Sequence, residues 1–211
     1  MLIGTSHIAK QSIKEVENAI KSLNPGVIAL ELDKTRFIAL TNKKHSLSLK
    51  GLSPTEAIIV LIGYYTEKLL GKAVGTTPGD EMKKAIELAK KEDIKIMLID
   101  QNIRVTLKKL KDALTFKEKM RFIKDILTSP FQRHPSIDLN KVPPEEVIHQ
   151  LLTATKKRYP NVYKVLVEER NQIMAKNLNR VIQDYPDQKV IAIVGAGHEK
   201  AIIDLIKHEN R

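Results

Sequence analysis

The pattern of apolar positions predicts strands and helices that alternate along much of the chain. Short apolar runs with almost no polar alternation are typical of strands that are covered on both faces. Such runs occupy residues 2–3, 27–32, 94–99 and 189–194. Apolar residues at three- and four-residue spacing indicate amphipathic helices, most clearly at 12–23, 80–89 and 161–185. Strands and helices in alternation predict an α/β fold with a central, mostly parallel or mixed sheet flanked by helices.

Capping signals indicate where three of the helices should begin. Ser12 with Glu15, and Thr115 with Glu118, have the Ser/Thr-x-x-Glu spacing of a capping box. The stretch 53–56 combines a serine N-cap, a proline at the first helical position and a glutamate at the third. We therefore expect a helix to start at each of these places.

Between the last two predicted strands the pattern is helical only. From about 104 to 160, apolar residues recur at helical spacing around a proline-rich polar loop, and no strand-like run occurs. A chain of 211 residues, 42% of them hydrophobic, is long enough for one large core. We expect a single domain over residues 1–211, with a helical insertion or lid at about 104–160.

Each predicted strand brings an ionisable side chain to its end. The first and last strands lead into Gly-x-x-His sequences, which supply His7 and His198, and the two middle strands supply Glu31 and Asp100. Open α/β sheets bind ligands at the carboxyl edge of their strands, where these side chains would meet. The sequence therefore predicts a site at that edge.

Glu31 and Arg170 are charged residues at positions that the apolar pattern predicts to be buried. A buried carboxylate needs a cation, a metal ion or a proton. Pairing of Glu31 with nearby Arg36 would be structural, whereas its place at a strand end suits a functional site. The guanidinium of Arg170 suits a carboxylate or an oxyanion. An ion pair of Arg170 with Glu31 or Asp100 is compatible with a role in a site.

The amino-acid composition limits the kinds of catalytic and metal-binding site that the chain can form. The chain has no cysteine, which excludes disulfides, thiolate ligands and a cysteine nucleophile. Two imidazoles and a carboxylate suit Zn²⁺, Mn²⁺ or Co²⁺ and leave a position for an activated water. The expected reaction is metal-assisted hydrolysis, with Glu31 or Glu81 as the base and Arg170 stabilising an oxyanion. Water activation without a metal is the alternative, and interaction with a helix dipole would be a sufficient structural role for Glu81.

Charge and hydropathy bear on partners and location. A net charge of +11 would suit an acidic partner such as nucleic acid. The lysines are spread over most predicted helices, however, and aromatic residues make up only 4% of the chain, which leaves little material for base stacking. A solvated lysine-rich surface, as in heat-adapted proteins, is therefore favoured over nucleic-acid binding. No apolar run approaches the ~20 residues of a membrane span, and no signal peptide precedes the first strand, so a cytoplasmic protein is expected.

Short motifs accompany the predicted elements in a fixed order. They are Gly4-Thr5-Ser6-His7, Glu31-Leu32-Asp33 with Arg36, Gly79-Asp80-Glu81-Met82, Ile99-Asp100, Val105-Thr106-Leu107, Glu169-Arg170-Asn171 with Met174-Ala175, and Val194-Gly195-Ala196-Gly197-His198. From Leu2 to about Leu205 this combination resembles the TraB/PrgY (pheromone shutdown) family. That family is related to the TIKI peptidases and GumN-like proteins and, more distantly, to the erythromycin esterase and ChaN folds.

The resemblance implies a site at which both Gly-x-x-His histidines and the glutamate meet. For the TIKI branch it implies metal-dependent peptide cleavage. The metal ligands that it implies are His7, Glu31 and His198. The catalytic residues expected beside Glu31 are Glu81, Arg170 and Asn171. The expected substrate-binding residues are Arg36, Asp100, Gly195 and Gly197.

Two departures from the family pattern affect these expectations. Gln101 and Asn102 stand where the family commonly has arginine and aspartate, which removes a charge pair near the edge of the sheet. Many members continue into a membrane-spanning C-terminal region, whereas this sequence ends at Arg211. Membrane association is accordingly expected only through such a region.

Two functions are compatible with these features. The leading expectation is a TIKI-like hydrolase that cleaves a peptide or a small ester with a divalent metal ion, Mn²⁺, Co²⁺ or Zn²⁺. The other is a non-catalytic regulator that binds or sequesters a signal peptide in the same cleft, as the missing charge pair would allow. In both cases the partner is a peptide or a small molecule, and the sequence is compatible with a homo-oligomer.

Overall fold

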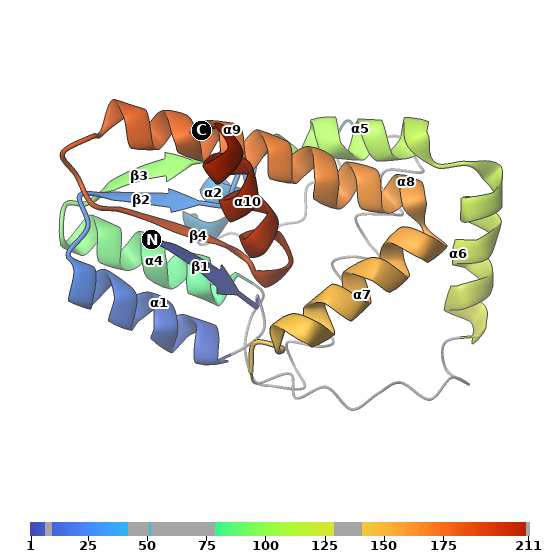
Figure 1. Ribbon diagram of the computed structural model, residues 1–211, viewed down its shortest axis with the longest axis horizontal. Helices are drawn as coiled ribbons and strands as arrows, with labels where there is room; N and C mark the ends of the chain where they lie inside the picture. The colour runs from blue at the N-terminus through green and yellow to red at the C-terminus, as the bar shows by residue number, and fades with distance from the viewer. Residues whose placement is uncertain (7–9, 42–50, 52–78, 129–140, 210–211) are drawn as a thin grey trace.

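A parallel sheet of four strands forms the centre of the molecule (Figure 1). The computed structural model describes residues 1–6, 10–41, 51, 79–128 and 141–209. His7 and the predicted helix start at 53–56 lie outside this part of the chain. The strands are β1 (Leu2–Thr5), β2 (Val27–Leu30), β3 (Lys95–Leu98) and β4 (Val190–Gly195), in the order β1-β4-β2-β3. All three strand pairs are parallel, which confirms the predicted α/β class.

Helices cover both faces of the sheet. One face packs against α1 (Lys10–Leu23) and α4 (Asp80–Lys91), and the other packs against α9 (Glu169–Asp184) and α10 (Ala196–Glu209). Figure 1 shows the sheet between these two helix layers. The result is a three-layer arrangement, in which both faces of every central strand are apolar.

Strand β2 shows how the chain divides its side chains between the layers. Ile28 and Leu30 belong to the core under α1 and α4, whereas Val27 and Ala29 belong to the core under α9 and α10. Successive side chains of a strand point to opposite faces, so a strand buried on both sides carries no polar alternation. By the same alternation, Glu31 follows Leu30 on the α9 side of the sheet.

Between β3 and α9, the elements in the described part of the chain are all helices. It contains α5 (Ile103–Ala113), α6 (Phe116–Thr128), α7 (Glu145–Arg158) and α8 (Pro160–Tyr163). These helices extend from one end of the sheet (Figure 1). A further helix, α2 (Lys34–Thr41), follows β2. In the part of the chain that the structure describes, no helix is long and apolar enough to cross a membrane. That residues from about 104 to 160 form an insertion or a lid remains a prediction.

The two capping boxes within the described residues had different outcomes. The Ser12 prediction was wrong, because α1 already begins at Lys10 and the Ser12 hydroxyl accepts a hydrogen bond from Ser6 N at 2.9 Å. The Thr115 prediction is confirmed, because Glu118 N donates to Thr115 Oγ1 at 3.2 Å and Thr115 N donates to Glu118 Oε2 at 3.1 Å. A serine inside a helix can still bind a nearby backbone amide, so spacing alone does not identify a cap.

The last strand continues directly into a helix. β4 ends at Gly195 and α10 begins at the next residue, Ala196. The predicted single helix at 161–185 is divided, because a π-helical turn (Lys164–Glu168) separates α8 from α9. Each of these features sets the direction of the side chains that follow it. The first lies just before His198 and the second just before Arg170.

Glu118, in the first turn of α6, links that helix to α8. Its carboxylate accepts hydrogen bonds from Thr115 N and Oγ1 and from Asn161 N and Nδ2, the last two at 2.9 and 2.8 Å. Burial by itself would raise the pKa of Glu118, but the four hydrogen bonds outweigh it and lower the pKa below 4.5. The ionised form of Glu118 therefore stabilises the joint between α6 and α8.

Replacing Glu118 by glutamine tests this joint. Because the pKa of Glu118 is lowered on folding, its stabilisation is present above about pH 4.5 and is lost as the pH falls through the folded-state pKa. We expect Glu118→Gln to reduce the free energy of unfolding by about 1–3 kcal/mol at neutral pH. The difference from the wild type should shrink at an acidic pH below that folded-state pKa, where the wild-type carboxyl is protonated too.

Urea unfolding followed by circular dichroism at both pH values measures this effect. Glu92→Gln is the matched control, because the Glu92 side chain is 52% exposed and lies outside the joint. The control should be indistinguishable from the wild type at both pH values. An equal loss for Glu118→Gln at neutral and acidic pH would contradict a stabilising carboxylate.

Candidate functional site

Charged side chains from four elements meet at the carboxyl edge of the sheet. Glu31 directly follows β2, Asp100 lies just beyond β3, and His198 lies in the first turn of α10 after β4. Arg170 comes from the first turn of α9. We call these four residues, together with Asn171, the Arg170 cluster. The sequence thus placed Glu31, Asp100 and His198 at a common edge, and the structure brings them together.

Arg170 binds two buried carboxylates at once. Its Nε donates to Asp100 Oδ1 at 3.1 Å and its Nη2 donates to Asp100 Oδ2 at 2.8 Å, which is a bidentate pair. Nη2 also binds Glu31 Oε1. The exposed fractions of the Glu31 and Asp100 side chains are only 3% and 4%. The guanidinium therefore neutralises two carboxylates that water scarcely reaches.

The charge of Arg170 is secured by these partners. Burial alone would lower its pKa, but the hydrogen bonds and charges of Asp100 and Glu31 raise the pKa of Arg170 above its usual value. Arg36 lies further out, with its Nη1 3.9 Å from Asp100 Oδ2 and its side chain 38% exposed. Of the two partners considered for Glu31, the distant Arg170 forms a direct ion pair with it.

A π-helical turn lies directly before the helical turn that carries Arg170. Glu169 N donates to Lys164 O, one residue further back than in an α-helix. The additional residue rotates the rest of the helix by about 100° relative to an uninterrupted one. Within this turn Val165 is buried, whereas Leu166 is half-buried. The Leu166 carbonyl then accepts a hydrogen bond from Arg170 Nη1 at 3.3 Å.

His198 is fixed in one tautomer. Its Nδ1 lies 2.6 Å from Asn171 Oδ1, an atom that can only accept, so Nδ1 carries the proton. Its Nε2 lies 3.2 Å from Arg170 Nη1, which can only donate, and 3.6 Å from Glu31 Oε1. The imidazole is therefore neutral in this arrangement, with the Nε2 lone pair directed into the cluster.

Glu31 is attached to β4 as well as to Arg170. Its amide donates to Ile193 O at 3.0 Å, and its Oε2 accepts a hydrogen bond from Gly195 N at 2.5 Å. Gly197 occupies the first turn of α10, where an added Cβ would lie 3.7 Å from Leu152 Cδ2. The contribution of Gly195 is thus a backbone N–H donor, and packing does not demand a glycine at position 197.

Asp33 is a positioning residue that the motif contained but whose role the sequence reasoning missed. Its Oδ1 accepts hydrogen bonds from Thr35 N and Arg36 N at the start of α2, at 2.5 and 3.0 Å. Its Oδ2 accepts from Ile103 N at the start of α5, at 2.9 Å. An aspartate just before a helix is a common N-cap, which was the available signal. One carboxylate thereby joins two helices to the end of β2.

Gln101 and Asn102, which depart from the family pattern, serve the start of α5. Gln101 Nε2 donates to Thr106 Oγ1 at 2.8 Å, and Asn102 Oδ1 accepts from Arg104 N at 2.9 Å as the N-cap. Their amides take part in local hydrogen bonds at the place where the family commonly has a charge pair.

The remaining candidates lie nearby or outside the described residues. Glu81 is buried in the first turn of α4. Because α4 leads into β3 and runs antiparallel to it, this turn lies at the same edge of the sheet. His7 is outside the described residues. Among the residues that the structure does describe, no three His, Asp or Glu side chains are arranged to hold a metal ion.

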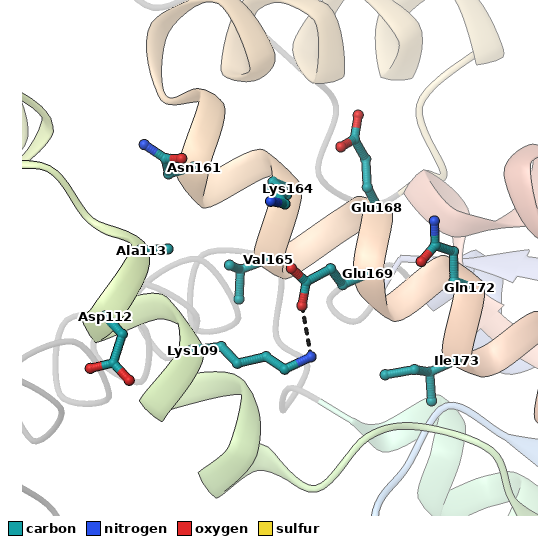
Figure 2. A pocket seen from close by; sticks show the side chains of 10 residues that line it. All are labelled: Lys109, Asp112, Ala113, Asn161, Lys164, Val165, Glu168, Glu169, Gln172 and Ile173. Atoms are coloured by element: carbon teal, nitrogen blue, oxygen red, sulfur yellow. Dashed lines mark hydrogen bonds and ion pairs between the residues drawn. The ribbon is translucent and has the colours of Figure 1, made fainter.

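A groove of 620 Å³ lies on the other side of the same turn of α9. It runs between α5 and the segment from α8 to α9, and Figure 2 shows its lining. Lys109 and Glu169 form an ion pair of 2.8 Å across it. Two consecutive residues of one helical turn therefore point in different directions. Glu169 lines the groove, and Arg170 binds the carboxylates beside the sheet.

Removing the guanidinium tests whether Arg170 holds the cluster together. Arg170→Met leaves Glu31 and Asp100 buried without this cation, and we expect the free energy of unfolding to fall by about 3–5 kcal/mol at neutral pH. The loss should shrink as the pH is lowered, because adding a proton to the carboxyl pair of the variant relieves the repulsion between two uncompensated charges. Arg170→Lys should show an intermediate loss, since an ammonium ion cannot reproduce the bidentate contact.

Chemical denaturation across this pH range measures both variants. Arg180→Met is the control, because Arg180 lies in the same helix and is exposed. If Arg170→Met were as stable as Arg180→Met at neutral pH, the ion pairs would not be a stabilising feature of the fold.

Comparison with known proteins identifies the family of this chain. Residues 1–209 match the model of the TraB/PrgY/gumN family. The uncharacterised protein MJ1365 of Methanocaldococcus jannaschii is 40% identical over 98% of this chain, which covers 53% of that protein. The human and bovine TraB domain-containing proteins are 24% and 22% identical over 95% of this chain, which covers 61% and 60% of their lengths. The chain thus spans only part of these relatives, and over that part it belongs to the TraB/PrgY/gumN family.

Proposed function

We propose that this chain hydrolyses a peptide or a small ester at the Arg170 cluster. One observation carries the proposal, namely the orientation of His198. Asn171 holds the ring with the proton on Nδ1, and Nε2 faces Glu31 Oε1 at 3.6 Å. A neutral imidazole of fixed tautomer beside a carboxylate is the arrangement that a general base requires.

Each residue of the cluster has a distinct part in this reaction. His198 Nε2 takes a proton from water while the water oxygen attacks the substrate carbonyl carbon. Glu31 stabilises the imidazolium that forms, and His198 then returns the proton to the leaving nitrogen or oxygen as its bond to carbon breaks. Once Nε2 carries the proton it no longer accepts a hydrogen bond from Arg170 Nη1, so that N–H can donate to the oxyanion while Asp100 keeps Nε and Nη2 in place.

In the metal-dependent form of this proposal a divalent ion would take the place of the general base, with His198 Nε2 and Glu31 as two of its ligands. Nε2 and Oε1 are 3.6 Å apart, close to the roughly 3.4 Å between two ligands of a tetrahedral ion with bonds of about 2.1 Å. The Nδ1 hydrogen bond to Asn171 is typical of a metal-binding histidine. A bound Zn²⁺, Mn²⁺ or Co²⁺ would supply a water of lowered pKa. His7 is the third ligand expected from the sequence.

A peptide-binding regulator is the second candidate. The observation that favours it is the saturation of Arg170, whose Nε and Nη2 are already held by carboxylates. Nη1 already contacts Leu166 O and His198 Nε2, so an oxyanion would have to replace one of these acceptors, whereas a peptide could be bound in the cleft without any reaction. In that case the same cleft would recognise a peptide and release it intact.

Changing His198 distinguishes the two functions. For the full chain, assayed with a peptide mixture and with nitrophenyl esters, we expect His198→Ala to lower kcat/KM by about 10²- to 10⁴-fold. Assays after chelator dialysis, with Mn²⁺, Co²⁺ or Zn²⁺ restored separately, measure the metal requirement. His149→Ala is the control, because His149 is an exposed histidine of α7, and its activity should equal that of the wild type.

The outcomes of this experiment are mutually exclusive. Cleavage that needs His198 but not His149 supports the hydrolase. Equal cleavage by all three proteins would place the reaction elsewhere and overturn the proposal. Saturable binding of a peptide that is recovered intact, with weaker binding to His198→Ala, would support the regulator instead.

A further inference from the structure

Helix α6 is attached to the rest of the protein by its polar side. Asp125 forms an ion pair with Arg158 and accepts a hydrogen bond from the Tyr159 hydroxyl. Glu118 binds the backbone and side chain of Asn161. Arg121 donates to the backbone carbonyl of Arg158, and the ring of Phe122 meets that of Tyr159 edge-on. The residues that make these contacts recur at helical spacing and share one face, at positions 118, 121, 122 and 125.

The opposite side of α6 combines exposed apolar residues with lysines. Phe116 and Met120, one helical turn apart, are 78% and 49% exposed. Lys117, Lys119 and Lys124 are exposed as well. A surface helix normally packs its apolar stripe inward and presents its charges to water. Here the acidic side chains face the protein, and an apolar, basic surface faces away from it. We call Phe116, Met120 and the three lysines the α6 surface.

The α6 surface is also the part of the insertion most remote from the sheet. Figure 1 shows α6 standing at the end of the molecule, beyond α5 and α8 and opposite the strands. A partner could therefore approach it without contacting the Arg170 cluster.

We propose that the α6 surface docks on an anionic membrane surface. A helix with an apolar strip between lysines lies in the interface of a bilayer, with the apolar side chains among the acyl chains and the ammonium groups at the lipid phosphates. Phe116 and Met120 supply the apolar strip, and the lysines supply the charge. This contact is peripheral and differs from attachment through a C-terminal spanning region.

Charge and hydropathy together favour this occupant over two others. A second copy of the chain would oppose the same lysines to one another, and like charges repel at contact distance. Nucleic acid would satisfy the lysines, but its phosphate backbone offers no apolar layer for Met120. An anionic bilayer satisfies both parts of the α6 surface.

A tryptophan placed in this surface reports contact with lipid directly. The chain contains no tryptophan, so Phe116→Trp is a single fluorescent probe. We expect its emission to shift to the blue with vesicles of equal parts phosphatidylcholine and phosphatidylserine, and to remain unshifted with phosphatidylcholine alone. Ile182→Trp is the matched control, because Ile182 is a 41% exposed residue of α9, and its emission should not shift with either vesicle.

Vesicle flotation measures the two contributions to binding. We expect Phe116→Ser with Met120→Ser to weaken binding to phosphatidylserine vesicles by about tenfold or more. The combined change of Lys117, Lys119 and Lys124 to glutamate should weaken it at least as much. The charge-matched control changes the exposed Lys83, Lys90 and Lys91 of α4 to glutamate and should retain most of the binding. Thermal unfolding checks that every variant is folded.

Several results would overturn the proposal. One is the absence of any blue shift of Phe116→Trp with anionic vesicles at low ionic strength. Another is an equal loss of binding in the α6 and α4 lysine variants, which would indicate attraction by net charge alone. A blue shift that grows with protein concentration without lipid would identify a second copy as the occupant, and a shift produced only by DNA would identify nucleic acid.

Discussion

The structure depends on a guanidinium held between two carboxylates that water scarcely reaches. Glu31 and Asp100 follow neighbouring strands, so the sheet itself brings like charges together, and each loses hydration on burial. The effective cost of burying one ion is several kcal/mol, which only a well-placed countercharge offsets. Arg170 supplies that charge from α9, a helix that is far from both carboxylates in sequence. The two carboxylates at the edge of the sheet are therefore neutralised only when α9 packs in the position that brings Arg170 to them.

The same arrangement prepares His198 for chemistry. Arg170 and Asn171 are consecutive residues, and they contact opposite nitrogens of the imidazole ring. The turn that neutralises the carboxylates thus also fixes the tautomer of the histidine. A fixed acceptor nitrogen beside a carboxylate suits either a general base or a metal ligand. The proposed hydrolase could therefore use His198 and Glu31 with or without a metal ion.

Polar contacts attach the helical insertion, whereas apolar contacts attach the helices that flank the sheet. Apolar layers hold α1, α4, α9 and α10, whereas single carboxylates act at the joints of the insertion. Asp33 fixes the start of α5, and Glu118 fixes α6 to α8. Polar joints depend on direction, so they can hold α6 with Phe116 and Met120 pointing outward. An apolar interface could not do so, because it would bury those residues itself.

Much of this architecture is determined by the sequence alone. Apolar runs and helical spacing identified the strands, the flanking helices and the all-helical segment, because burial on one or two faces imposes a local period. The buried charges at positions 31 and 170 identified candidates for the site, since such charges need partners. Only the tertiary structure decided which partners they have. Glu31 pairs with Arg170 rather than with a neighbour in sequence because α9 packs across the sheet and brings the start of that helix to the end of β2. The direction in which α6 faces was likewise decided by contacts with Arg158 and Tyr159, since an amphipathic pattern gives a helix two faces but does not say which of them meets the protein.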